Sequence, residues 1–320
     1  MKKNQLKKLA VSLTAVLFTA AVTTGCSVLD QAPTANEESG LHSQTETAND
    51  TKDEKTGAQS AHHDSSGQNR LEQIKSRGYI EIATEPYFAP NEFIDPSKNG
   101  NEKYVGSDIE LAKYIAGELG VECRIVPLDF TSVLSSVTEG KYDMAISALS
   151  YTPARAEAME LSKGYYFDSE SVQYGLMVRN ENLEAIKSVD DLAGKSIVVQ
   201  SGSIQEMFAN EQVPSYGELK RVSATTDGFL MVQEKKVDSV ITAVTTAQLY
   251  IDANEDCGMS IVPGLEFVVD EATQGERIGI PKGEKELLEE VNAIIDDVTK
   301  QGLYTKWYQE YKEYARSLGL

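Results

Sequence analysis

The residue best suited to binding a small anion is Arg155. Thr152 and Pro153 are typical of the start of a helix, as an N-cap followed by proline at the first helical position. Arg155 then falls in the first turn, where the helix dipole makes a cation mildly unfavourable, so that its placement needs a reason. Its planar guanidinium matches the two oxygens of a carboxylate. We therefore interpret Arg155 as a carboxylate clamp; the alternative is an arginine exposed to solvent.

Small polar residues occur just before this helix. Residues 143–148 are largely apolar and predict a buried strand, so Ser147, Ala148 and Ser150 lie near its carboxyl end. Ligands of open α/β sheets usually bind at that edge. Hydroxyl and backbone groups there could hold a carboxylate and an ammonium. The alternative is that these serines only form the turn between strand and helix.

The residue inventory excludes several kinds of chemistry. All three histidines lie before residue 70, so the folded part cannot carry a Ser-His triad, a histidine base or an imidazole metal site. The three cysteines are too few for a disulfide scaffold or for the usual four-ligand thiolate zinc site. We predict no metal and no cofactor. The residues concerned are His42, His62, His63, Cys26, Cys123 and Cys257.

Length and composition indicate a globular protein of about two lobes. The 320 residues are 41% hydrophobic and 25% charged, which excludes collagen-like, wholly disordered and polytopic membrane chains. Fifty acidic against 30 basic residues give a net charge of −20. Nucleic acid and anionic lipid surfaces would repel such a chain, so we expect neither as a partner.

The N-terminus has the pattern of an export signal. Residues 1–8 carry four lysines and no acid, and residues 9–22 are largely apolar, a run too short to cross a bilayer. Gly25-Cys26 follows and resembles a bacterial lipobox, although Thr23 stands where leucine is usual. We expect a lipoprotein signal peptide over 1–25 and lipidation of Cys26; the alternative is an ordinary secretory signal. Residues 26–69 contain no Phe, Tyr or Trp and predict a disordered tether spanning roughly 35–40 Å.

The rest of the chain alternates strand-like and helical patterns, which predicts an α/β fold. Ser203 and Glu206 have the spacing of a capping box, and Gly120 and Gly302 are expected to end helices. The expected strands are 79–83, 123–126, 143–148 and 196–199. The expected helices are 108–119, 132–138, one from 152, one from 203, 287–298 and 303–311.

Seven segments, in this order and spacing, resemble the polar amino-acid substrate-binding proteins of ABC importers, family 3 of the bacterial extracellular solute-binding proteins. The first three are GYIEIATE with FAP, VGSDIELA, and GKYDMAISALSYT with Arg155. The others are DLAGK, QSGS, VDSVI and GLYTKW. The resemblance implies a two-lobe periplasmic-binding-protein-like fold of type II, with ligand in a cleft between lobes joined by two crossover strands.

The resemblance also implies a division of the chain and a set of partners. Lobe 1 would be residues 70–172 plus 283–320 and lobe 2 residues 173–282, with crossovers near 170–174 and 277–282. Hinge closure on the ligand would create the form that a permease recognises. The implied partners are a small amino acid or related organic acid and the permease subunits of an ABC importer. We expect a monomer at the extracytoplasmic face of the cell membrane, held there by the lipid anchor alone.

The family pattern assigns roles to individual residues. Arg155 would bind the ligand's α-carboxylate, and Phe88 and Phe130 would sandwich its side chain, unless either is simply core. Glu85 would face a cationic or polar end of the ligand. The segment 200–204 would complete the carboxylate cage at a helix N-terminus. The expected ligand-binding residues are Glu85, Phe88, Phe130, Ser147, Ala148, Ser150, Arg155, Gln200, Gly202, Ser203, Ile204 and Thr242.

Ala243 departs from the family pattern. Many relatives carry an aspartate five residues after the position of Asp238, where it neutralises the ligand's ammonium. Two explanations stay open. Either Glu85 supplies the negative charge, or the ligand is modified, N-acylated or a non-amino organic acid.

Two other classes of function remain open beside the binding component of an importer. An enzyme on the same fold, such as a cyclohexadienyl dehydratase, could use Glu85 as a general acid without any histidine. A sensor module is the third possibility, and the lack of a spanning segment after the signal counts against it.

Overall fold

The computed structural model describes residues 67–167, 173–270 and 274–320. The proposed signal, Cys26 and nearly all of the proposed tether therefore lie outside the described residues. Asn69, the last residue of the expected tether, already belongs to the folded part, because it caps the first helix in a complete capping box with Glu72. In the described part of the chain, no helix is both long and apolar enough to cross a bilayer.

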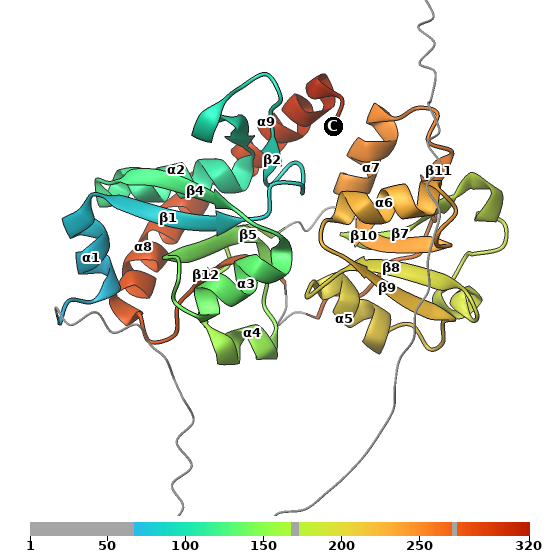
Figure 1. Ribbon diagram of the computed structural model, residues 1–320, viewed down its shortest axis with the longest axis horizontal. Helices are drawn as coiled ribbons and strands as arrows, with labels where there is room; N and C mark the ends of the chain where they lie inside the picture. Colours follow the sequence, from blue (N-terminus) through green and yellow to red (C-terminus); the bar gives the residue numbers. More distant parts are fainter. Residues whose placement is uncertain (1–66, 168–172, 271–273) are drawn as a thin grey trace, which may run out of the picture. The chain divides into compact units, whose positions relative to one another are not determined.

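The first lobe is built on a five-stranded sheet of order β4-β1-β5-β12-β6 (Figure 1). Strand β1 pairs parallel with both β4 and β5, whereas β12 runs antiparallel to β5 and β6. Its strands are β1 (Tyr79–Thr84), β4 (Glu122–Pro127), β5 (Met144–Ser150), β6 (Glu160–Leu161) and β12 (Glu276–Ile280). Its helices are α1 (Arg70–Arg77), α2 (Ser107–Leu119), α3 (Phe130–Thr138), α4 (Pro153–Ala158), α8 (Lys285–Gln301) and α9 (Leu303–Leu318).

The second lobe repeats this arrangement in a sheet of order β11-β7-β10-β8-β9. Strand β10 pairs parallel with β8 and antiparallel with β7. Its strands are β7 (Tyr174–Arg179), β8 (Ser196–Gln200), β9 (Glu218–Val222), β10 (Ser239–Ala243) and β11 (Met259–Ile261). Its helices are α5 (Ile204–Glu211), α6 (Thr225–Gln233) and α7 (Val244–Ala253), with short 3-10 turns η2 (Asn180–Asn182) and η3 (Val189–Leu192).

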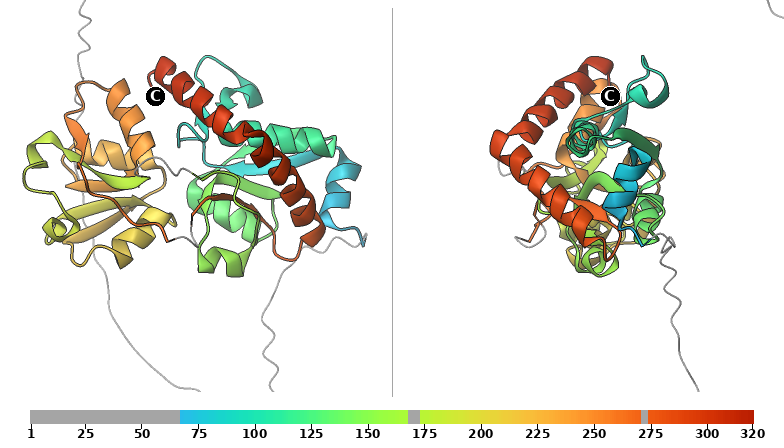
Figure 2. Two further views of the ribbon diagram at one scale, coloured as in Figure 1. Left: turned by 180° about the vertical axis from the view of Figure 1, so that it is seen from behind. Right: turned by 90° about the vertical axis from the view of Figure 1, so that its left-hand side faces the viewer.

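A small hairpin completes the first lobe. Strands β2 (Phe93–Ile94) and β3 (Tyr104–Val105) pair antiparallel and flank the 3-10 turn η1 (Gly100–Lys103). From behind, α8 passes beside α1 and α9 continues across α2 (Figure 2). The C-terminal helices therefore pack on the same lobe as the first residues of the described chain.

Period-two alternation along the strands gives each sheet two buried faces. In the first lobe, Ile80 and Ile82 pack with α2 and α8, whereas Ala83 packs with α3 on the other face. In the second lobe, Leu176 packs with α5 and Met177 with α6 and α7. Both sheets are thus covered on both sides, as the α/β expectation requires.

Most of the expected elements are confirmed, with shifts at their ends. Helix α3 begins at Phe130 rather than Ser132, because the side chain of Asp129 caps it by accepting from the amide of Ser132. The capping box expected at α5 is incomplete. Ser203 accepts from the amide of Glu206, but the carboxylate of Glu206 accepts from Gly202 instead of Ser203.

The connections between the lobes include residues 168–172 and 271–273, which are outside the described residues, so the first expected crossover is described only from residue 173. The second crossover strand was expected over residues 277–282, within lobe 2. Residues Glu276–Ile280 instead pair with β5 and β6 in the sheet of lobe 1. The chain has thus already joined the first sheet at Glu276, before the expected boundary at 282.

Candidate ligand-binding site

A cavity lined by both lobes collects ten of the twelve expected ligand-binding residues. Its lobe 1 wall is Glu85, Phe88, Glu92, Phe130, Ser147, Ala148, Ser150 and Arg155. Its lobe 2 wall is Tyr174, Gln200, Ser203, Ile204 and Gln205. The empty volume is about 330 Å³, including the open mouth. Aromatic rings, two carboxyl groups and a guanidinium thus share one small space.

Arg155 is held between the two lobes. Its Nη1 donates to the carbonyl of Ser150 at 2.7 Å and its Nη2 to the carbonyl of Gly202 at 3.0 Å. The ring of Phe130 lies 5.5 Å below the guanidinium carbon. The residue is only 7% exposed, and burial lowers its pKa to about 10. It forms no ion pair with a described carboxylate, so a buried cation faces this cavity with only carbonyl acceptors. Such a group favours an anionic ligand.

The local sequence explains this placement. Thr152 caps α4 by accepting from the amide of Arg155 at 3.1 Å, and Pro153 occupies the first turn. The helix is therefore fixed directly after β5, and its third residue is directed back over the end of that strand. The expected strand–cap–arginine arrangement is confirmed as structure.

The end of β5 is tied to carboxyl groups. Ser147 Oγ donates to Glu92 Oε1 at 2.8 Å and accepts from the amide of Glu85 at 3.1 Å. Ala148 adopts a positive φ of 46°, and its amide donates to Asp108 Oδ2 at 2.7 Å. The strained turn lets strand, loop and helix meet at one point, as is common at functional sites.

Glu85 follows β1 directly and is 1% exposed. Burial raises its pKa to about 8, opposed in part by a hydrogen bond from Gln200, while Asp227 and Asp129 raise it further. Its Oε1 has no hydrogen-bond partner among the described residues. A buried carboxyl group of this kind would be stabilised in its charged form by a cationic ligand group.

Glu92 also lines the cavity, although no sequence pattern predicted it. It is 1% exposed, and its pKa is raised well above the usual range by burial and by the charge of Asp108. Its Oε2 also lacks a partner among the described residues. No periodic pattern marks the segment 88–92; Glu92 is placed by backbone hydrogen bonds with Phe88. Tyr174 and Gln205 were missed as well.

The second-lobe wall agrees in part with expectation. Ser203 Oγ donates to the carbonyl of Gln200 at 2.7 Å, which fixes the turn before α5. Gly202 does not line the cavity by itself but contributes the carbonyl that holds Arg155, and its amide already donates to Glu206. Thr242 is buried and does not line the cavity, because its side chain lies within β10 near the carbonyl of Ala243.

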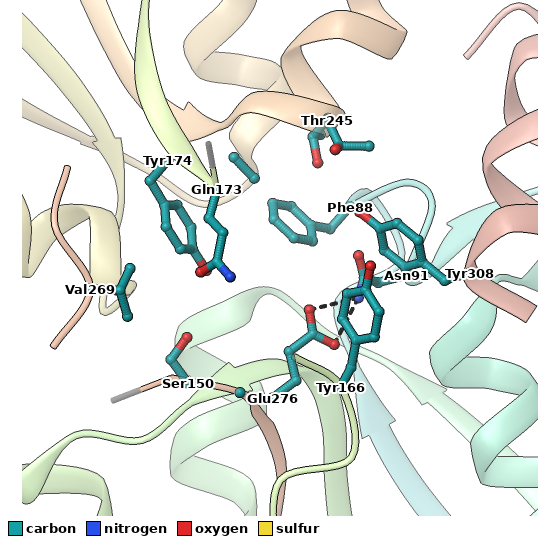
Figure 3. Close-up of a pocket in the computed structure, with 13 residues that line it drawn as sticks. Phe88, Asn91, Ser150, Tyr166, Gln173, Tyr174, Thr245, Val269, Glu276 and Tyr308 are labelled. Atoms are coloured by element: carbon teal, nitrogen blue, oxygen red, sulfur yellow. Dashed lines mark hydrogen bonds between the residues drawn. The ribbon is translucent and has the colours of Figure 1, made fainter. Parts of the chain in front are cut away.

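A second cavity adjoins the first and shares Phe88, Ser150 and Tyr174 with it. Ala243 and Glu276 also line it, and Glu276 pairs with Ser150 between β12 and β5. Figure 3 shows the Glu276 carboxylate directed at the amide of Asn91, whose Nδ2 donates to both oxygens at 3.0 and 3.1 Å. The described residues hold no group of three or more His, Cys, Asp or Glu arranged to bind a metal ion.

Comparison with known proteins now identifies the class of protein. Residues 80–314 match the family described as bacterial extracellular solute-binding proteins, family 3. The chain belongs to this family. Its fold is accordingly the two-lobe, type II periplasmic-binding-protein fold expected from the sequence, which the two matching sheet orders also display.

Three relatives indicate the range of this family. The arginine-binding extracellular protein ArtP of Bacillus subtilis is 28% identical over 212 residues, covering 65% of this chain and 79% of ArtP. The amino acid ABC transporter substrate-binding protein AbpA of Streptococcus pneumoniae, solved with L-arginine, is 33% identical with a TM-score of 0.68, covering 76% of this chain and 98% of AbpA. An ancestral amino acid-binding protein, AncCDT-1, described as a precursor of cyclohexadienyl dehydratase, is 27% identical with a TM-score of 0.64, covering 75% and 98%.

Proposed function

We propose that this family 3 protein captures an amino acid outside the cytoplasm and delivers it to the permease of an ABC importer. The observation that carries the proposal is Arg155, a buried guanidinium between two backbone carbonyls with no described carboxylate as its partner. An α-carboxylate fits this group in charge and in its planar, two-pronged geometry. The similarity to the arginine-binding protein ArtP and to the amino acid substrate-binding protein AbpA supports this choice of ligand class.

The favoured ligand is a cationic amino acid such as L-arginine. Phe88 and Phe130 line the cavity that contains Arg155, which suits a long side chain lying between two rings. Glu85 lies in the same wall, and its unpartnered oxygen would accept from the cationic end of such a side chain. Our proposed binding site consists of the twelve expected residues except Thr242, which lies outside the cavity. Glu92, Tyr174 and Gln205 are added to it.

We further propose that the chain is exported by residues 1–25 and anchored through a lipid on Cys26. The tether after Cys26 would hold the folded part clear of the membrane, where a monomer could meet its permease. This proposal rests on the lipobox-like sequence and on the family, which is extracellular.

Binding without turnover is part of the proposal. Two buried carboxyl groups with raised pKa, Glu85 and Glu92, could serve as general acids in an enzyme of the dehydratase type. Incubation with prephenate-like acids separates the two functions. We expect no product, and multiple turnovers would replace the transport role by an enzymatic one.

A calorimetric panel of the twenty standard L-amino acids tests the binding function. We expect saturable heat with L-arginine or a similar cationic amino acid. Native mass spectrometry of the freshly purified protein checks for a copurified molecule of matching mass. Absence of heat with every amino acid, together with a different bound molecule, would overturn the proposed function.

A further inference from the structure

The proposed ligand needs an anionic partner for its α-ammonium, and β10 does not supply one. Its last residue, Ala243, lines the second cavity, which adjoins the cavity that contains Arg155, and its side chain is only a methyl group. An ammonium left unpaired in such a site would be costly. Another carboxylate within reach of the Arg155 end of the ligand would supply the missing partner.

Glu276 lines the same cavity as Ala243 and approaches from β12 in the other lobe. Its carboxylate accepts from Asn91 Nδ2 and from the hydroxyl of Tyr304 at 3.1 Å. It forms no ion pair with a described lysine or arginine. Burial and the charge of Asp108 raise its pKa well above the usual range, so a cation beside it would relieve an unfavourable charge.

Tyr174 lies where the cavity of Glu276 and the cavity of Arg155 meet. Its ring lines both cavities, and Ser150, whose carbonyl holds Arg155, lines both as well. The pKa of Tyr174 is raised to about 12, mainly by burial; Ser150 and Arg155 lower it, whereas the charge of Glu276 raises it. Glu276 also pairs with Ser150 between β12 and β5, so the carboxylate and the guanidinium both approach the end of β5. The carboxylate and ammonium of an α-amino acid are separated by a single carbon, so the pair of charges suits that group.

We propose that Glu276 pairs with the α-ammonium of the ligand, in place of the carboxylate that Ala243 lacks, and makes the site select for a free amino group. This inference rests on the proposed function. It leaves Glu85 for the far end of the ligand side chain and removes the need for a modified or non-amino ligand.

The test compares L-arginine with 5-guanidinopentanoic acid, which has the same chain without the α-amino group, by calorimetry on the full chain. Glu276→Gln should weaken the affinity for L-arginine about 30-fold or more. It should change the affinity for the deaminated acid by less than about threefold. Glu266→Gln, at an exposed position, is the matched control and should change neither. Should another amino acid bind more tightly, it and its deaminated counterpart are used instead.

Two further variants separate charge pairing from general damage. Tyr304→Phe removes a hydrogen bond to Glu276 but keeps the carboxylate, so the preference for the amino compound should survive. Ala243→Asp placed in the Glu276→Gln background should restore part of the L-arginine affinity. Equal weakening of both ligands by Glu276→Gln, or no weakening, would overturn the inference while leaving the proposed function intact. A wild type that binds no amino acid would instead overturn both.

Discussion

The buried carboxyl group of Glu85 suits a cationic ligand but lowers the stability of the ligand-free protein. In the unfolded chain its pKa would be near the ordinary value of 4.5, whereas burial raises the pKa in the folded protein to about 8. Between these values the folded state keeps a proton that the unfolded state has released. Raising the pH through this window therefore lowers the free energy of unfolding.

Glu85→Gln removes this titration and should raise the thermal unfolding temperature of the ligand-free protein at pH 8.5. The gain in stability should be at most about 5 kcal/mol, since the pKa rises from 4.5 to about 8 on folding and each pKa unit corresponds to about 1.4 kcal/mol. At pH 4.5 the difference should shrink towards zero, because Glu85 is then protonated in the folded state and about half protonated in the unfolded state, so that little proton release accompanies unfolding. Glu266→Gln serves as control. A difference that is equal at both pH values would contradict the raised pKa.

At the scale of elements, the loop that carries Phe88 and Glu92 depends on Gly106 at the start of α2. Gly106 has a φ of 132°, and a Cβ there would lie 2.1 Å from the carbonyl oxygen of Asn91. That carbonyl accepts from the amide of Asp108 at 2.8 Å. The loop and the helix are thus joined by backbone contact, which leaves no room for a side chain.

Gly106→Ala should destabilise the protein by about 2 kcal/mol or more, through both the backbone strain and the clash. Ligand affinity should fall as well, because the segment that includes Glu92 must move. Gly117→Ala, within α2 and with open space around it, should be neutral or stabilising by up to about 1 kcal/mol. Chemical denaturation measures both variants. Equal stability of the two would show that the loop is not held in this way.

The elements also explain what could be predicted from sequence. Arg155, Ser150 and Ser203 sit beside caps and strand ends that have recognisable local patterns, and the structure places all three at the cavity. Glu92 and Glu276 lie in segments without periodicity. Their positions depend on a loop packed against Gly106 and on a strand that returns to the first sheet from the other lobe. Such long-range pairing leaves no local signal.

At the scale of the whole molecule, anchoring at Cys26 decides where the ligand is captured. Cys26→Ala should move the protein from the membrane fraction to the soluble fraction of cells that express it. Cys123→Ala, in the folded part, should remain with the membrane. Mass spectrometry of the mature N-terminus should find a diacylglyceryl group on wild type alone. Unchanged membrane association of Cys26→Ala, without a lipid mass on wild type, would rule out the anchor.

The most direct test of the account is the affinity of Arg155→Ala for L-arginine, measured by calorimetry beside wild type and Arg124→Ala, an exposed arginine on β4. Loss of a buried charge partner typically costs about 2–5 kcal/mol, so the account predicts an affinity roughly 30-fold to several-thousand-fold weaker for Arg155→Ala and unchanged for Arg124→Ala. Thermal unfolding confirms that each variant is folded. A folded Arg155→Ala protein that binds L-arginine within about threefold of wild type would contradict the account.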